Sequence, residues 1–237
     1  MHKNKFNINY WLRKIFTTKI FQLLPLNETK IKKKIFTSIY KSNHWVQNSS
    51  LLPKDYVSVS GHGSNINTEQ HKQLTYNFTE IIKKYKINSI LDMPCGDFLW
   101  IKDIIKKNNI DYLGIDIVDD LINNNNKKYQ DQKTNFQTFD IVEFKSNKKF
   151  DLVLIRDLFI HIKNKDVLKI LNNLKSINTK YIILNSYINV QNNDVIIGQH
   201  RKVNLSIEPF NLKEPIYKFK DYEDDKFFFL YDLKSLF

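Results

Sequence analysis

Four aspartates each follow a short apolar run of the sequence, and carboxylates at such positions can bind the polar groups of a ligand. They are Asp92, Asp116, Asp140 and Asp157. In an open parallel sheet the carboxyl ends of the strands lie along one edge, where ligands bind. We therefore expect these four side chains to lie around one ligand.

The first of these aspartates opens the segment DMPCGDF, residues 92–98. Gly96 would let the backbone approach a ligand closely, ahead of a helix N-terminus. The segment is not GxGxxG, because Pro94 and Phe98 stand where glycines would be, and this disfavours the dinucleotide site of a nicotinamide dehydrogenase. We expect Asp92 to orient a ligand ammonium; the alternative is an aspartate that caps its own loop.

The next two aspartates suit the two halves of an adenosine group. Asp116 lies 24 residues after Asp92, near the spacing of a carboxylate that accepts hydrogen bonds from both ribose hydroxyls. Asp140 could accept a hydrogen bond from an adenine amino group while Ile141 packs on the ring. The alternative for Asp140 is a turn residue.

The fourth aspartate has a histidine four residues after it. One helical turn would let Asp157 and His161 face one ligand, as a base and the residue that orients it. The alternative is an N-cap aspartate and a structural histidine. Arg156 and Arg201 are two of only three arginines in the chain, and an arginine grips phosphate or carboxylate in a planar, bidentate way. We expect them to hold an anionic or polar acceptor; the alternative for Arg201 is a surface arginine.

Short apolar runs alternate with amphipathic stretches from residue 87 onward, which predicts a parallel sheet covered by helices on both faces. The predicted strands are 87–92, 111–117, 135–139, 150–155 and 180–185, and the predicted helices are 98–107, 119–129 and 164–175. Residues 186–214 form a long irregular stretch, and such loops are often functional. Residues 215–220 and 226–232 read as a hairpin. The fold class is therefore α/β, a Rossmann-like, doubly wound and mostly parallel sheet with an antiparallel C-terminal hairpin.

The chain divides into a basic helical accessory segment, residues 1–60, and a main domain, residues 61–237. Thr68 is a good N-cap for a helix that follows it. In the accessory segment apolar residues recur at helical spacing until Pro25 ends the predicted helix. They are Ile8, Trp11, Leu12, Ile15, Phe16, Ile20 and Leu23. Two interpretations of residues 7–24 agree with this pattern. The helix packs on the main domain, which we favour, or it lies on an anionic membrane.

The composition excludes several classes of protein. Of 237 residues, 42% are apolar and 14% aromatic, which excludes a disordered chain. No apolar run reaches the ~18 residues of a membrane-spanning helix. The single cysteine, Cys95, excludes an internal disulfide and a multi-cysteine zinc site, and we expect a reducing, cytoplasmic location. The net charge of +12 permits nucleic acid as a partner. However, the lysines are scattered, and Lys, Asn and Ile together are typical of A/T-rich codons.

Taken in order, ILDMPCGDF, YLGIDIV, FQTFDI and FDLVLIRDLFIHI resemble the motifs of class I S-adenosylmethionine-dependent methyltransferases. More narrowly, the chain resembles a bacterial branch of that family with an SGxGS loop, a DxPCGDF first motif, an IRD-type fourth motif and a late G-x-x-R-x-x-N-L segment. The matching segments are SGHGS (60–64), DMPCGDF (92–98), IRD (155–157) and GQHRKVNL with PFNLKEP (198–215). The resemblance covers about residues 60–237.

The resemblance implies S-adenosylmethionine as cofactor, S-adenosylhomocysteine as its product, and no metal. It implies that Asp92 and Gly96 hold the methionine end, Asp116 the ribose, and Asp140 the adenine. The full set of expected cofactor residues is Trp45, Ser64, Asp92, Pro94, Cys95, Gly96, Asp116, Ile117, Asp140, Ile141 and Arg156. Trp45 and Ser64 are expected to close over the cofactor, and Cys95 is a loop residue rather than a nucleophile. The expected acceptor site contains Arg156, Tyr187 and Arg201, with Asp157 and His161 as the catalytic pair.

The acceptor is inferred from the fourth motif. Methyltransferases that act on exocyclic base nitrogens carry [DNS]PP[YFW] there, and Arg-Asp-Leu-Phe departs from it. We therefore expect O-methylation of a small polar or anionic acceptor. Relatives of this branch often accompany surface-glycan genes, which suggests a sugar, phosphate or phosphoramidate group of a capsule or surface-glycan precursor, with no nucleic acid partner. Two alternatives stay open, an RNA methyltransferase and a non-catalytic S-adenosylmethionine-binding partner subunit.

Overall fold

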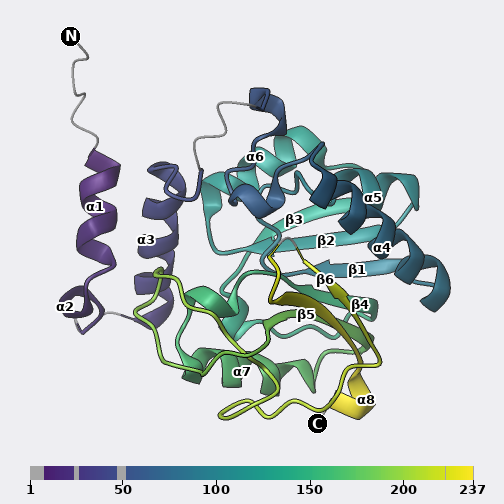
Figure 1. Cartoon of the computed structure of the whole chain (residues 1–237). Helices are drawn as coiled ribbons and strands as arrows, with labels where there is room; N and C mark the ends of the chain where they lie inside the picture. Colours follow the sequence, from purple (N-terminus) through teal and green to yellow (C-terminus); the bar gives the residue numbers. More distant parts are fainter. Residues whose placement is uncertain (1–7, 24–26, 47–51, 222, 237) are drawn as a thin grey trace.

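The computed structural model describes residues 8–23, 27–46, 52–221 and 223–236. Its centre is a seven-stranded sheet in the order β3-β2-β1-β4-β5-β7-β6 (Figure 1). The strands are β1 Ser89–Asp92, β2 Asp111–Asp116, β3 Thr134–Thr138, β4 Phe150–Ile155, β5 Thr179–Tyr187, β6 Tyr217–Lys220 and β7 Lys226–Asp232. The first five run parallel, and β7 lies antiparallel between β5 and β6. This confirms the predicted fold class.

Helices cover both faces of the sheet, which explains why its central strands read as continuous apolar runs. Consecutive strand residues point to opposite faces, so Ile90 joins the core with α4 (Glu69–Tyr85) and α5 (Lys102–Lys107). Leu91 joins the core on the other face, with α7 (Asn164–Leu174) and α8 (Leu233–Leu236). The strand order reverses between β1 and β4, so the carboxyl ends of these two strands flank the switch point of the sheet.

Most predicted elements are found at or near their predicted bounds. Strands β4 and β7 and helix α6 (Asp119–Tyr129) have the predicted bounds. Thr68 caps α4, since its hydroxyl accepts from the backbone N–H of His71 at 3.1 Å. The prediction of a helix over residues 98–107 was wrong for its first turn, residues 98–101. Phe98 has φ +62°, a left-handed conformation outside a helix, so α5 begins only at Lys102.

The predicted N-terminal helix is divided in two. Helix α1 spans Ile8–Phe16 and α2 spans Lys19–Gln22, because the hydroxyl of Thr18 caps a new start by accepting from the backbone of Phe21. Pro25, the predicted end of the helix, lies outside the described residues. None of the helices in the described part of the chain is long and apolar enough to cross a membrane.

Helix α3, Glu28–Lys41, was not predicted. The side chain of Asn27 caps it, and Ile31, Ile35 and Ile39 form one buried stripe that packs with Phe21 of α2. In Figure 1, α3 stands between α1 and the carboxyl edge of the sheet. The accessory segment therefore supplies a wall next to the strand ends.

Candidate active site

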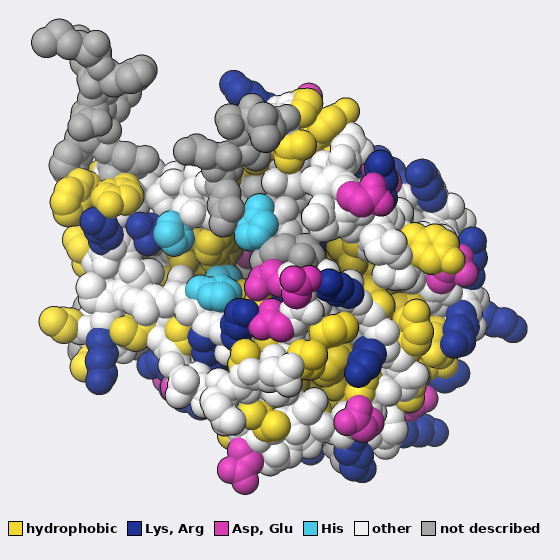
Figure 2. Space-filling model, in the orientation of Figure 1, with side chains coloured by type: hydrophobic (Ala, Val, Ile, Leu, Met, Phe, Trp, Pro, Cys, Tyr) yellow, Lys and Arg dark blue, Asp and Glu magenta, His cyan; other side chains and the backbone are white. Residues whose placement is uncertain are grey.

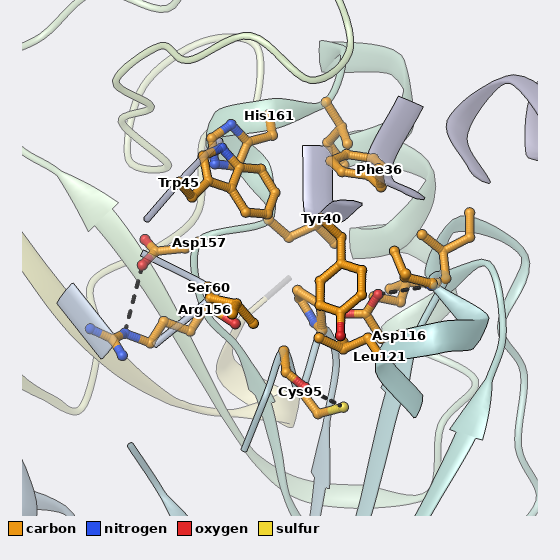
Figure 3. Close-up of a pocket in the computed structure, with 18 of the residues that line it drawn as sticks. Phe36, Tyr40, Trp45, Ser60, Cys95, Asp116, Leu121, Arg156, Asp157 and His161 are labelled. Carbon is orange, nitrogen blue, oxygen red and sulfur yellow. Dashed lines mark hydrogen bonds and ion pairs between the residues drawn. The ribbon is translucent and has the colours of Figure 1, made fainter. Parts of the chain in front are cut away.

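A pocket of about 1030 Å³, its open mouth included, lies between α3 and the carboxyl ends of the strands (Figure 3). It brings together most of the residues singled out from the sequence. They are Trp45, Ser64, Pro94, Cys95, Gly96, Asp116, Ile117, Asp140, Ile141, Arg156, Asp157 and His161. Asp92, Tyr187 and Arg201 do not line it.

The loop after β1 forms part of the pocket wall and binds a second loop. Gly96 has φ +52°, and a Cβ atom there would lie 2.3 Å from the hydroxyl oxygen of Ser60, so only glycine fits. The carboxylate of Asp97 accepts from the hydroxyl of Ser58 at 2.9 Å and from the backbone N–H of Val59 at 2.9 Å. The first motif therefore fixes the SGHGS loop against the pocket.

Asp92 lies buried beneath the pocket, at 1% exposure. The hydroxyl of Tyr112 donates to its Oδ2 at 2.6 Å, while Oδ1 has no hydrogen-bond partner among the described residues. Burial raises the pKa of Asp92 to about 7, against the hydrogen bond from Tyr112 and the charge of Arg156. A buried carboxyl group with a spare oxygen suits a cationic ligand above it.

Asp116 ends β2 and faces the pocket. Its Oδ1 accepts from the backbone N–H of Val118 at 3.1 Å. Burial raises the pKa of Asp116 to about 6, opposed by backbone hydrogen bonds from Val118, Gly96 and Ile117. The carboxylate keeps further lone pairs for the two hydroxyls of a ribose.

Asp140 is held by α3, which the sequence did not predict. Its Oδ2 accepts from the hydroxyl of Thr29 at 2.6 Å and pairs with Lys32 Nζ at 2.9 Å, while Oδ1 accepts from the backbone of Val142. Lys32 is 2% exposed, so the ion pair is removed from water. Any hydrogen bond from an adenine amino group would be additional to these contacts.

His161 and Trp45 form one end of the pocket (Figure 3). Their rings stack at 4.8 Å with an interplanar angle of 25°. The Nδ1 atom of His161 lies 3.0 Å from the carbonyl oxygen of Gln199. Because a carbonyl can only accept, Nδ1 carries the proton, and Nε2 of the neutral ring is an acceptor that makes no hydrogen bond to the described residues. Burial lowers the pKa of His161 to about 4, against the opposing effects of Gln199 and Asp157.

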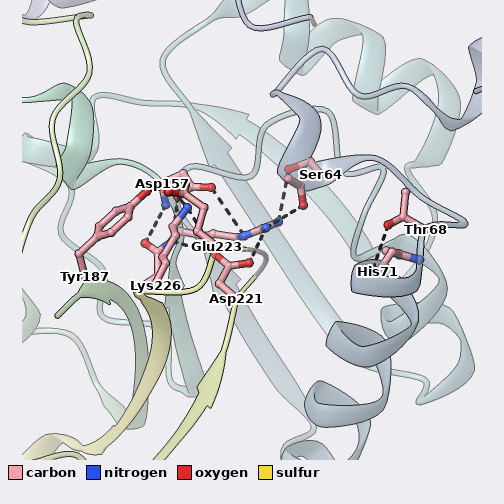
Figure 4. A network of polar contacts seen from close by, with 11 residues as sticks. Ser64, Thr68, His71, Asp157, Tyr187, Asp221, Glu223 and Lys226 are labelled. Atoms are coloured by element: carbon pink, nitrogen blue, oxygen red, sulfur yellow. Dashed lines mark hydrogen bonds and ion pairs between the residues drawn. The ribbon is translucent and has the colours of Figure 1, made fainter. Parts of the chain in front are cut away.

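Asp157 belongs to a buried charge network behind the pocket (Figure 4). Lys226, at 1% exposure, places Nζ 2.5 Å from Oδ1 of Asp157. Asn185 donates to the same carboxylate oxygen at 2.7 Å and accepts from the backbone N–H of Asp157. These contacts hold Asp157 at φ +58°, a strained conformation for an aspartate. Burial alone would raise the pKa of Asp157, but Lys226 and Arg156 outweigh it and hold the pKa well below its ordinary value.

Arg156 has most of its hydrogen-bonding capacity engaged by the protein. Its guanidinium lies 4.7 Å from the ring centre of Trp100 and donates to the carbonyl of Gly63 at 2.8 Å, to the hydroxyl of Ser64 at 3.3 Å and to Asp221 at 3.1 Å. Its side chain is 4% exposed. Arg156 therefore binds the SGHGS loop to the sheet, which leaves little of the guanidinium for an acceptor.

The structure does not bring Arg201 and Tyr187, the residues expected to bind the acceptor, into the lining of the pocket. Arg201 is 9% exposed and donates to the backbone carbonyls of Phe159 and Ile162 at 3.3 and 2.9 Å. Its Nη1 group donates to the backbone carbonyl of Asn193 and to the side-chain oxygen of Asn164, so both terminal nitrogens of the guanidinium are engaged by the irregular 186–214 stretch and its neighbours. Tyr187 is 1% exposed, and its hydroxyl donates to Glu223 at 2.7 Å. Both side chains stabilise the loop architecture outside the pocket.

Sequence reasoning missed the contribution of α3 to the pocket. Lys32, Phe36 and Tyr40 line it, one position after each member of the buried Ile31, Ile35 and Ile39 stripe. That four-residue spacing was the signal available in the sequence. Within the described residues, no group of three or more His, Cys, Asp or Glu side chains is arranged to hold a metal ion.

Comparisons with known proteins agree with this geometry. Residues 90–179 match a family model described as a methyltransferase domain. No curated protein matches the chain. Magnesium protoporphyrin IX methyltransferase from Synechocystis PCC 6803, solved with S-adenosylmethionine, is 13% identical with a TM-score of 0.58 over 87% of this chain and 96% of its own. An S-adenosylmethionine-dependent methyltransferase from Clostridium acetobutylicum is 15% identical, with a TM-score of 0.51 over 70% and 93%.

At such identities the solved structures show a shared fold only. Whether the pocket suits the cofactor depends on the chemistry of its own residues. Asp116 lines the pocket and suits the ribose, and Ile117 and Ile141 supply apolar walls for the adenine. Asp92 lies outside the pocket lining, but its buried carboxyl group with a spare oxygen suits the cationic methionine end. These residues fit S-adenosylmethionine. The match of residues 90–179 to a methyltransferase domain, the fold and the pocket together support S-adenosylmethionine-dependent methyl transfer as the activity of this chain.

Proposed function

We propose that the enzyme methylates an oxygen of a small polar acceptor, in the class of sugar, phosphate or phosphoramidate groups on surface-glycan precursors. The observation that carries this proposal is that Asp157, paired with Lys226, and His161, hydrogen-bonded to the carbonyl of Gln199, both line the pocket. S-adenosylmethionine supplies a methyl group on a sulfonium. The chain must then hold the acceptor oxygen in line and accept its proton.

The two residues suit different tasks. Asp157 stays ionised at neutral pH because Lys226 stabilises its charge, so it is a poor proton acceptor and a strong hydrogen-bond acceptor. His161 is unprotonated at neutral pH, and the carbonyl of Gln199 leaves its Nε2 available. Because the pKa of His161 is still higher than that of Asp157, His161 is the stronger base of the two, and we infer that it is the general base while Asp157 orients a hydroxyl of the acceptor.

Within this class, the charges favour a neutral hydroxyl over an anionic oxygen. Arg201 and Tyr187 lie outside the pocket, so they offer no grip on an anion. The carboxylate of Asp157 would repel a phosphate oxygen brought next to it. A sugar hydroxyl can instead donate to Asp157 and lose its proton to His161.

The test is methyl transfer from labelled S-adenosylmethionine to nucleotide sugars, free sugars, sugar phosphates and total RNA, followed as S-adenosylhomocysteine release. We expect transfer to a hydroxyl-bearing sugar compound. His161→Gln should lower kcat at least about 100-fold while cofactor affinity stays unchanged. His200→Gln, a matched change at the neighbouring ring 5.9 Å away, should have little effect.

Two results would contradict the proposal. Transfer to RNA alone would assign the enzyme to RNA modification. Cofactor binding with no turnover on any acceptor, and indifference to His161→Gln, would favour a non-catalytic subunit.

A further inference from the structure

Exposed apolar side chains are concentrated in α1 and α2. Of the eleven large hydrophobic side chains that are exposed in the described part of the chain, six lie within residues 8–23. They are Ile8, Tyr10, Trp11, Ile15, Ile20 and Leu23, at 41–79% exposure. Single exposed apolar residues need no explanation, but a cluster in one short segment indicates an interaction surface.

The side of this segment that faces the rest of the protein is already packed against it. Packing within the chain therefore does not explain why apolar side chains lie on the opposite, exposed side. Phe21 is buried against the isoleucines of α3. The side chain of Gln22 donates to the carbonyl of Ile197 at 3.1 Å and accepts from its backbone N–H at 3.2 Å. These contacts fix α2 to the main domain and α1 along α3.

The outer side of α1 is a continuous apolar stripe. Ile8, Trp11 and Ile15 follow the i, i+3, i+7 spacing of one helix face, and they are 59%, 49% and 53% exposed. Helix α1 has no buried residue at all. We name the exposed side chains of Ile8, Trp11, Ile15, Ile20 and Leu23 the outer stripe.

The segment that carries the outer stripe contains side-chain charges of only one sign. Residues 1–27 contain five Lys or Arg and no Asp or Glu. Lys14 Nζ lies 5.3 Å from the ring centre of Trp11, at the border of the outer stripe. Figure 2 shows hydrophobic and basic side chains side by side at the edge of the molecule where Figure 1 draws α1. An apolar helix face flanked only by cations, with a tryptophan in it, complements an anionic lipid surface.

We propose that the outer stripe binds the surface of a membrane that contains anionic phospholipids. The apolar side chains enter the boundary between headgroups and acyl chains, while Arg13, Lys14 and Lys19 contact the headgroups. Because α1 packs on α3, and α3 lines the pocket, binding would hold the active site close to the membrane.

The experiment is co-sedimentation of the full chain with vesicles. One set contains equal amounts of phosphatidylcholine and phosphatidylglycerol, and the other contains phosphatidylcholine alone. We expect binding to the anionic vesicles only, and weaker binding as salt rises because screening reduces the attraction. The double variant Trp11→Ser/Ile15→Ser should bind at least about tenfold more weakly.

Matched controls separate the outer stripe from apolar surface in general. Leu168→Ser/Ile216→Ser removes two side chains of similar exposure, 41% and 45%, from the main domain, and should bind vesicles as wild type does. Lys14→Glu/Lys19→Glu should lose the preference for anionic vesicles, whereas Lys72→Glu/Lys83→Glu on α4 should keep it. Cofactor titration of the same proteins should give unchanged affinity, so a failure here is distinguishable from a failure of the proposed function.

Three outcomes would overturn the proposal. One is no binding to anionic vesicles, and a second is equal binding by Trp11→Ser/Ile15→Ser. The third is a wild-type dimer in sedimentation velocity that dissociates in this variant, which would make the outer stripe a contact between two copies of the chain.

Discussion

Asp157 and His161 stand four residues apart, but they do not share a helical turn. Asp157 has a left-handed backbone conformation, and His161 follows in a short 3-10 helix. The sequence predicted that both would face one ligand, and the pocket brings them together by a different route. Their electrostatic surroundings, which no spacing rule contains, differ, and this difference is the basis of the separate roles that we propose for them.

Lys226 should be essential for the charge network. Lys226→Met would deprive the buried Asp221 and the partly exposed Asp157 of this cation, which lies 3.5 and 2.5 Å from them. Breaking such a pair costs about 3–5 kcal/mol, so we expect a loss of this size in the free energy of unfolding, measured by urea denaturation. Lys220→Met, at an exposed pair, should leave the unfolding midpoint unchanged. A stable Lys226→Met protein would contradict the network's role.

Cofactor binding should depend on pH through Asp92. The pKa of Asp92 in the free protein is raised to about 7 by burial, so the carboxyl group is mostly protonated at about pH 6. A ligand with positive charge favours the ionised form, and binding must therefore release a proton below about pH 7. We expect S-adenosylmethionine affinity to rise between about pH 5.5 and 7.5. Calorimetry in buffers of different ionisation enthalpy measures how many protons are released when the cofactor binds. Asp92→Asn should reduce the dependence to the part contributed by Asp116, whose pKa is about 6, and a flat wild-type profile would contradict this prediction.

Among the secondary-structure elements, the parallel strands could be predicted from the sequence, whereas helix α3 was not predicted. The strands from β1 to β5 could be predicted because each is a short apolar run between helical patterns, and parallel topology then brings their carboxyl ends to one edge. Helix α3 was missed although Ile31, Ile35 and Ile39 recur at helical spacing, because the lysines between them make the segment read as polar.

The 186–214 stretch could not be predicted in the same way. It has no periodicity, so the sequence does not say where Arg201 and Tyr187 point. The guanidinium of Arg201 suits backbone carbonyls as well as it suits an anion. The structure shows that the guanidinium donates hydrogen bonds to backbone carbonyls.

Substitutions at two adjacent residues of α3 should have different effects, one mainly on stability and the other mainly on cofactor binding. Ile35 is fully buried, and Ile35→Ala should lower the free energy of unfolding by about 2–5 kcal/mol. Phe36 lines the pocket, and Phe36→Ala should weaken S-adenosylmethionine binding about tenfold or more, with a smaller effect on stability. Thermal unfolding and calorimetric titration of both variants would check this. Equal cofactor affinity in wild type and Phe36→Ala would exclude α3 from the cofactor site.

At the scale of the whole molecule, the sheet, α3 and the pocket together form one cofactor-binding unit. The sheet supplies the strand-end carboxylates, the SGHGS loop is fixed by Asp97 and Arg156, and α3 closes one side. The outer stripe lies on the far side of α3 and plays no part in this arrangement.

The most direct test of the central claim is calorimetric titration of S-adenosylmethionine, S-adenosylhomocysteine and NAD into wild type and Asp116→Ala. We predict that both sulfur ligands bind, that NAD does not, and that Asp116→Ala weakens both by about 5- to 150-fold, since buried ribose hydroxyls lose their acceptor. No binding of either sulfur ligand to the wild type, or equal affinity in Asp116→Ala, would contradict the assignment of this pocket to S-adenosylmethionine.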